Sequence, residues 1–278
     1  MENSVKFEKN PFGKRLCSML RVDTHRMLRS KLFYIIIACA LLVPVVMTVM
    51  LTMMDGQESV NQQTGEVTIM EGPESVWESI GTLPIPSDTE GDPTAAMAGM
   101  DVMTMCNINM AFMGIAVFVC LFISEDFRSG YAKNLFTVRS KKTDYVISKT
   151  VVGAICGALM LIAYFVGALL GGAVSGLSFE LVGDMSVMGL VMCILAKIFL
   201  MLVFVSIFTL ISVAAKQKAW LSICGSLGGG MLLFMMVPMI TPLNSSALNL
   251  VLCLIGGTLF AVGIGALSNL VLKKTSMV

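Results

Sequence analysis

The segment Ser124–Lys149 reads SEDFRSGYAKNLFTVRSKKTDYVISK and separates two apolar runs, 102–123 and 150–174. It carries six basic and three acidic residues. A basic loop between two runs of membrane length belongs on the cytoplasmic side of a bilayer, because Lys and Arg set membrane orientation. We therefore expect 124–149 to be a cytoplasmic loop, large enough to form a short helix that docks a cytosolic partner.

The whole composition agrees with a membrane protein. Mean hydropathy is +0.85, and charged residues make up only 13% of the chain, against about a quarter in soluble domains. Uncharged runs reach or exceed the roughly 20 residues that cross a bilayer. We therefore predict an all-α integral membrane protein, 1–278, forming a single domain with six transmembrane helices at 32–54, 102–123, 150–174, 187–215, 219–239 and 247–271.

The charges are distributed unevenly, and this predicts the orientation. Eighteen of the nineteen Lys and Arg residues fall in four clusters, at 6–31, 128–149, 216–218 and 273–274. Ten acidic residues and no basic residue lie between Asp55 and Asp101. The predicted topology therefore has both chain ends inside and an acidic extracellular loop at 55–99. That loop either attracts a cationic substrate or simply avoids positive charge.

The leader, 1–31, is polar and basic. Its apolar residues recur at roughly helical spacing, as do the charged residues between them. This pattern predicts an amphipathic interface helix that lies in the headgroup region. The alternative is an irregular basic tail that only enforces orientation. The apolar residues of the proposed stripe are Phe12, Leu16, Met19, Leu20 and Met27.

Energy-coupling and catalytic motifs are missing from the sequence. It contains no GxxxxGK[ST] loop, no HExxH and only one histidine, His25. The eight cysteines have neither metal-ligand nor disulfide-framework spacing. We therefore expect neither a catalytic residue nor a cofactor or metal bound by this chain, and no nucleic-acid partner. A secondary transporter acting alone would need carboxylates inside its spans, and none is present there. A non-transporting sensor or scaffold is the remaining alternative.

Lys197 is the one charged residue well inside an apolar run. A lysine at the bilayer centre costs about 2.5–3.5 kcal/mol on insertion, so such residues tend to serve a function. Lys197 either faces a polar pathway or extends its ammonium group to the outer interface. Asn107 and Asn109, near the outer end of the second span, are further candidates for such a pathway.

The order of these features resembles the type-2 ATP-binding-cassette permeases, over the whole chain. The resemblance rests on the basic leader, the six spans, and the motif Glu125–Leu135 followed by a basic cluster at 139–142. The chain is most similar to permeases that accompany antibiotic- and lantibiotic-resistance or export ATPases of Gram-positive bacteria. The large acidic outer loop departs from many members of that family.

The resemblance implies a multi-pass protein of a bacterial plasma membrane that exports a peptide or lipophilic compound. It implies pairing with a second permease copy or a paralogue, with spans two and five at the dimer interface. It also implies a cytosolic ATPase subunit that binds ATP and magnesium. Glu125–Leu135 would be the coupling helix that seats in this ATPase.

Within that segment, Phe127, Tyr131 and Leu135 follow one another at intervals of four and would share one face of a continuous helix. Aromatic residues are frequent interface anchors. Glu125 and Arg128 are spaced to pair with each other or with the partner. Gly130 would allow close approach or end the first turn. The alternative is a solvated basic loop without a partner. The residues expected to bind the ATPase are Glu125, Phe127, Arg128, Gly130, Tyr131 and Leu135.

Overall fold

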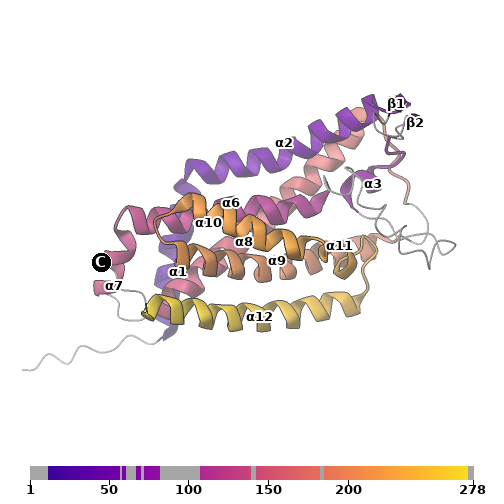
Figure 1. Cartoon of the computed structure of the whole chain (residues 1–278). Coiled ribbons are helices and arrows are strands. Elements are labelled where there is room, and N and C mark those ends of the chain that lie inside the picture. The colour runs from indigo at the N-terminus through magenta and orange to yellow at the C-terminus, as the bar shows by residue number, and fades with distance from the viewer. Residues whose placement is uncertain are drawn as a thin grey trace, which may run out of the picture.

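A computed structural model describes residues 12–56, 58–60, 67–69, 72–81, 107–138, 142–181 and 185–274. Within them the chain is almost entirely helical (Figure 1). The long helices are α2 (Lys31–Met53), α6 (Ala111–Arg128), α8 (Lys142–Ser175), α9 (Val187–Ala215), α10 (Ala219–Phe234) and α12 (Ala247–Lys274). They run side by side as a bundle, and α1 (Phe12–Arg29) crosses one end of it (Figure 1).

Five of the described helices are long and apolar enough to cross a membrane: α2, α6 with its leading turn η2 (Ile108–Met110), α8, α9 and α12. The predicted fifth span, 219–239, is a shorter helix, α10, of 16 residues followed by a turn and α11 (Val237–Ile240). Pro238 explains the interruption, because it lacks the N–H that would continue the α10 hydrogen-bond ladder. The described residues therefore contain six apolar helical segments, and the fifth is broken near one end.

Two helix boundaries differ from the prediction at the end of the bundle where α1 lies. α6 continues to Arg128 and α8 already begins at Lys142, so much of the expected loop 124–149 is helical. Between them lies α7 (Tyr131–Val138). Residues 102–106, the predicted start of the second span, lie outside the described residues.

Glycines of α8 let its neighbours approach closely. A Cβ at Gly167 would overlap the Leu41 carbonyl oxygen of α2. On another side of α8, a Cβ at Gly157 would come within 2.6 Å of the Met201 side chain of α9. α8 contains two GxxxG pairs, Gly153/Gly157 and Gly167/Gly171, and both lie at helix contacts, as small residues in membrane helices do. α12 completes the bundle by packing along α9.

The opposite end of the bundle carries the described parts of the predicted acidic loop: the antiparallel strands β1 (Glu58–Val60) and β2 (Val67–Ile69) and the short helix α3 (Val76–Ile80). Trp77 of α3 is buried, and its Nε1 donates to the carbonyl oxygens of Phe179 (3.3 Å) and Glu180 (3.0 Å). The two connections at this end therefore pack on each other. Residues 82–99 lie outside the described residues.

The predicted leader helix is present as α1. Met19 and Met27 of the expected apolar stripe are buried, and α1 packs on the first turns of α8. Asp23, which the sequence pattern assigned to the polar face, is buried as well. That departure places a charge inside the protein and leads to the candidate site.

Candidate functional site

α7 and its flanking turn form the end of the bundle that the sequence singled out. α6 ends at Arg128, where the backbone N–H of Ser129 donates to the carbonyl oxygen of Glu125 over 2.9 Å. Gly130 then takes a φ of +75°, a left-handed conformation that glycine adopts without the Cβ clash of other residues. The chain reverses there, and α7 starts at Tyr131.

The expectation of one continuous helix from Glu125 to Leu135 is therefore wrong. Gly130 divides it, so Phe127 lies on α6 while Tyr131 and Leu135 lie on α7. The physical reason is the positive φ at Gly130, which no α-helix can contain. The regular spacing of the three side chains consequently does not place them on one helical face.

The structure also turns these three apolar side chains toward the protein itself. Phe127 and Leu135 are half-buried against the core cluster, and the Phe127 ring meets Tyr145 of α8 edge-on at 6.4 Å. Tyr131 lies under the guanidinium of Arg26, 4.1 Å from its ring centroid. The residues left exposed on α7 are instead polar: Lys133, Asn134 and Thr137.

Glu125 and Arg128 pair as their spacing predicted, with 2.7 Å between Oε2 and Nη2. Both side chains remain more than half exposed, at 52% and 74%. An exposed ion pair of this kind contributes little to stability, typically below about 1 kcal/mol. Both charges therefore stay accessible to a partner.

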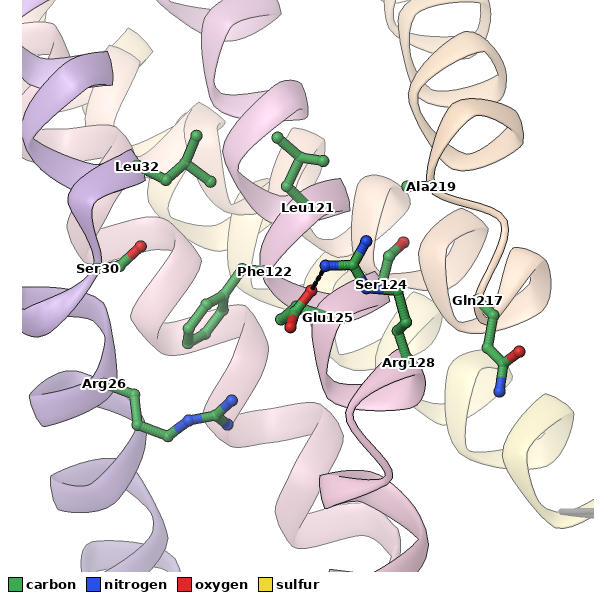
Figure 2. A pocket seen from close by; sticks show the side chains of 10 residues that line it. All are labelled: Arg26, Ser30, Leu32, Leu121, Phe122, Ser124, Glu125, Arg128, Gln217 and Ala219. Atoms are coloured by element: carbon green, nitrogen blue, oxygen red, sulfur yellow. Dashed lines mark ion pairs between the residues drawn. The ribbon is translucent and has the colours of Figure 1, made fainter.

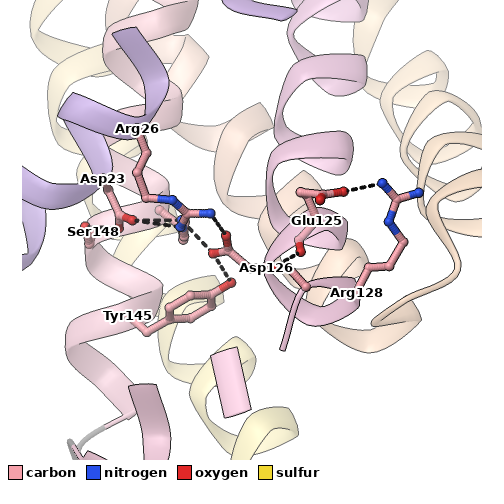
Figure 3. Close-up of polar contacts among 9 residues, drawn as sticks. Asp23, Arg26, Glu125, Asp126, Arg128, Tyr145 and Ser148 are labelled. Atoms are coloured by element: carbon pink, nitrogen blue, oxygen red, sulfur yellow. Dashed lines mark hydrogen bonds and ion pairs between the residues drawn. The ribbon is translucent and has the colours of Figure 1, made fainter. Parts of the chain in front are cut away.

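Beneath α7 lies a cluster of four charged side chains, which we call the ion cluster: Asp23, Arg26, Asp126 and Lys149 (Figure 3). Three of them are fully buried, whereas the Arg26 side chain is 29% exposed. Lys149 Nζ lies 2.9 Å from Asp23 Oδ1 and 2.7 Å from Asp126 Oδ2. Arg26 Nη2 lies 2.7 Å from Asp126 Oδ1. Two positive and two negative charges balance, which is the condition for burying charge at acceptable cost.

Neutral groups complete the ion cluster. The hydroxyl of Tyr145 donates to Asp126 Oδ2 over 3.0 Å, and that of Ser148 donates to Asp23 Oδ2 over 2.5 Å. The Lys149 ammonium also lies 4.0 Å from the centroid of the Phe122 ring, within cation–π range. The ion cluster thus joins α1, α6 and α8 at one point. A second link, Arg15 to Asp144 over 3.1 Å, ties α1 to α8 nearby.

The ion cluster sets the charge state of the groups that border α7. Burial opposes the charge on Arg26, but Asp126 outweighs it and the pKa of Arg26 is raised, so the guanidinium stays charged. Burial, with Asp23 next, raises the pKa of Tyr131 above its usual value, so the phenol stays neutral. The neutral Tyr131 ring of α7 therefore packs face-on against the Arg26 guanidinium, which stays charged.

The second candidate group lies at the opposite end, around Lys197. Lys197 is 2% exposed, and its Nζ donates to Asn109 Oδ1 (2.7 Å), to Thr241 Oγ1 (2.9 Å) and to the Thr241 carbonyl oxygen (3.1 Å). These three acceptors hold the ammonium inside the protein, next to the turn that follows α11, and a role for Lys197 in a polar pathway stays a prediction. Asn107 is buried beside it and caps η2 by accepting from the Asn109 N–H over 2.9 Å.

The structure therefore unites Lys197 with Asn109, and it places both away from Glu125–Leu135. Sequence reasoning missed most of the ion cluster. The available signal was Asp23, the single acidic residue among the basic residues of 9–31, together with Lys149 at the start of an apolar run. Neither residue could be paired from sequence, because 126 positions separate them.

Comparison with protein families adds the decisive observation. Residues 25–232 match the model of the ABC-2 family transporter proteins. The chain belongs to the ABC-2 transporter family. No curated protein and no solved structure matched the chain significantly.

The matched residues include α2, α6, α7, α8 and α9, with most of α10 and the last turn of α1. This ABC-2 chain is thus a multi-pass transporter permease, a membrane subunit that is not itself catalytic. The family in general works with an ATP-binding-cassette ATPase and pairs within the membrane. α7 and three of the four residues of the ion cluster, Arg26, Asp126 and Lys149, lie within the matched range.

Proposed function

We propose that this permease is the membrane subunit of an ATP-driven exporter in a bacterial plasma membrane. It moves a peptide or lipophilic compound, such as an antimicrobial peptide, while a separate cytosolic ATPase binds ATP and magnesium. The observation that carries the proposal is α7, a short helix with a polar exposed face, seated on the ion cluster at one end of the bundle.

The charges support a cytoplasmic location for that end. α1, the α9–α10 link with Lys216 and Lys218, and the end of α12 with Lys273 and Lys274 all gather there with α7 (Figure 1). The acidic connections lie at the other end. This is the arrangement that the positive-inside rule favours for N-in and C-in chains.

The ATPase would contact the exposed side of this end. Lys133, Asn134 and Thr137 face away from the protein on α7, and Glu125 with Arg128 stands next to them at the end of α6. Tyr131 and Leu135 then serve as the inward anchors of α7, and Phe127 as that of the end of α6. They transmit force rather than bind the partner.

The packed side chains would transmit force from α7 to the membrane helices. A displacement of α7 acts on Arg26 through Tyr131, and Arg26 is bound to Asp126 of α6 over 2.7 Å. Lys149 of α8 binds the same Asp126 carboxylate and so links α6 to α8. Interactions of buried charges are stiff, because separating them exposes an uncompensated charge. α1, α6 and α8 therefore move with α7 as one body.

The second permease copy would pack on α10. Its outward residues are apolar and exposed, with Trp220 at 68% and Leu232 at 79%. α6 is the other span that the resemblance places at the dimer interface. In its most apolar stretch 67% of the residues are buried inside this chain, so α6 would contribute less surface to that interface.

Reconstitution tests this proposal. The permease is placed in liposomes with a candidate ATPase, and ATP hydrolysis and export of a labelled peptide are measured. The double variant Asn134→Trp with Thr137→Trp should strongly lower the ATP hydrolysis that the permease stimulates. The matched control is Met239→Trp, an exposed position at the opposite end, and it should leave hydrolysis unchanged. Equal hydrolysis in both variants would refute the assignment of α7.

A further inference from the structure

A cavity of about 340 Å³ opens beside the ion cluster, between α1, α6 and the start of α10 (Figure 2). We propose that it binds the phosphate group of a phospholipid, with one acyl chain along its apolar wall. The proposal does not rest on the ATPase or on transport, because binding is a property of the permease alone.

Unpaired donors are the first reason. Ser124 is 3% exposed, lines the cavity, and its hydroxyl has no hydrogen-bond partner within the described residues. Arg26 lines the same cavity, and its Nη1, 3.8 Å from Asp23 Oδ1, likewise makes no hydrogen bond within the described residues. Buried donors are nearly always satisfied, so two in one cavity indicate an absent acceptor. Phosphate oxygens accept from both hydroxyl and guanidinium groups.

The charge of the lining agrees with a phosphate. It contains two arginines, Arg26 and Arg128, against one carboxylate, Glu125. Arg128 has five N–H donors, and its ion pair with Glu125 leaves others for a ligand. Asp126, behind Arg26, is also bound by Lys149. Glu125 and Asp126 therefore each have a cationic partner already, whereas the Ser124 hydroxyl has none.

The rest of the wall is apolar. Leu32 of α2 and Leu121 and Phe122 of α6 line it, with Ala219 at the start of α10 (Figure 2). A ligand that matches this cavity has an anionic head and an adjoining hydrocarbon chain. A phospholipid combines both.

The cavity also lies at headgroup depth. Ser30, in its lining, is the break between the amphipathic α1 and the apolar α2. Tyr34 is 59% exposed one turn into α2, and Trp220, next to Ala219, is 68% exposed. Exposed Tyr and Trp are typical of the membrane–water interface. The site therefore meets lipid phosphates rather than acyl chain ends.

The test is lipid-induced thermal stabilisation of the purified permease in detergent, since a ligand of the folded state raises its melting temperature. Dioleoylphosphatidylglycerol should raise the melting temperature of the wild type, and dioleoylglycerol, which lacks the phosphate, should not. Ser124→Ala should need roughly tenfold more phospholipid for the same shift, as expected for one lost hydrogen bond to a charged group.

Ser124→Ala should leave the lipid-free melting temperature unchanged or higher, because it removes an unsatisfied hydroxyl. Ser129→Ala, an exposed serine five residues along the chain and outside the lining, is the matched control and should respond like the wild type. Ala219→Phe, which fills the cavity from the opposite wall, should abolish the phospholipid effect.

Equal lipid responses of the wild type, Ser124→Ala and Ala219→Phe would overturn the proposal. An equal response to dioleoylglycerol would do the same, because it would assign the effect to the acyl chains. Inorganic phosphate separates the two sources of the anion. A Ser124-dependent shift with phosphate as large as that with phospholipid would show a free-phosphate site and overturn the lipid assignment.

Discussion

Replacing Lys149 by methionine should destabilise the permease severely. Lys149 contacts two buried carboxylates, at 2.9 and 2.7 Å, and none of the three side chains is exposed. The variant would leave two buried negative charges with the single cation Arg26. Removing one partner of a buried ion pair typically costs about 3–5 kcal/mol. For a chain of this size that corresponds to a fall in melting temperature on the order of 10 °C.

The balance of charge provides the sharper arm of this experiment. Asp23→Asn together with Lys149→Met leaves Arg26 and Asp126 as a neutral pair, and Ser148 still has an oxygen to donate to. The double variant should therefore melt above Lys149→Met alone, with a coupling energy of about 1–3 kcal/mol.

Thermal unfolding in detergent, followed by tryptophan fluorescence, measures both effects. Lys218→Met is the control, because Lys218 is exposed in the α9–α10 link and its loss should matter by no more than about 0.5 kcal/mol. Two results would refute the reasoning. One is a melting temperature of Lys149→Met equal to that of the control, and the other is a melting temperature of the double variant below that of Lys149→Met.

Three further predictions concern the turn, the second polar group and the orientation. Gly130→Ala should cost about 1 kcal/mol of unfolding free energy through its positive φ, whereas Gly13→Ala, with equally open space but in a helix, should cost nothing; thermal melting compares the two. Lys197→Met should lower stability by about 1–3 kcal/mol, since it leaves three buried acceptors without a donor; a rise in melting temperature would contradict the geometry. In intact cells, on a background without native cysteines, an impermeant thiol reagent should label a cysteine at Ser87 and not one at Ser140; the reverse would invert the topology.

Much of the architecture could be predicted from the sequence, because membrane spans are set by local composition. Apolar runs identified the long helices and the positions of their connections. The start of α8 at Lys142 was missed, since the helix begins well before its apolar run. No local signal in the sequence marks where its polar first turns begin. The break at Pro238 was placed in the outer turn, although it already interrupts the fifth apolar segment.

The site was harder to predict, since it depends on distant pairs. Asp23 had the spacing of a polar-face residue on an amphipathic helix, and only the position of α8 shows that Lys149 neutralises it. Phe127 and Leu135 fitted a helical repeat, but the conformation of Gly130 ended that helix. Short-range patterns therefore misassigned which side chains of Glu125–Leu135 are exposed.

The central claim is that the exposed side of α7 binds the ATPase. The most direct measurement is photo-crosslinking from a genetically encoded crosslinker at single positions of the assembled complex. Crosslinks to the ATPase should form from Asn134 and Thr137, and not from Met239, which is 82% exposed at the opposite end. Crosslinks from Met239 with none from α7 would contradict the account.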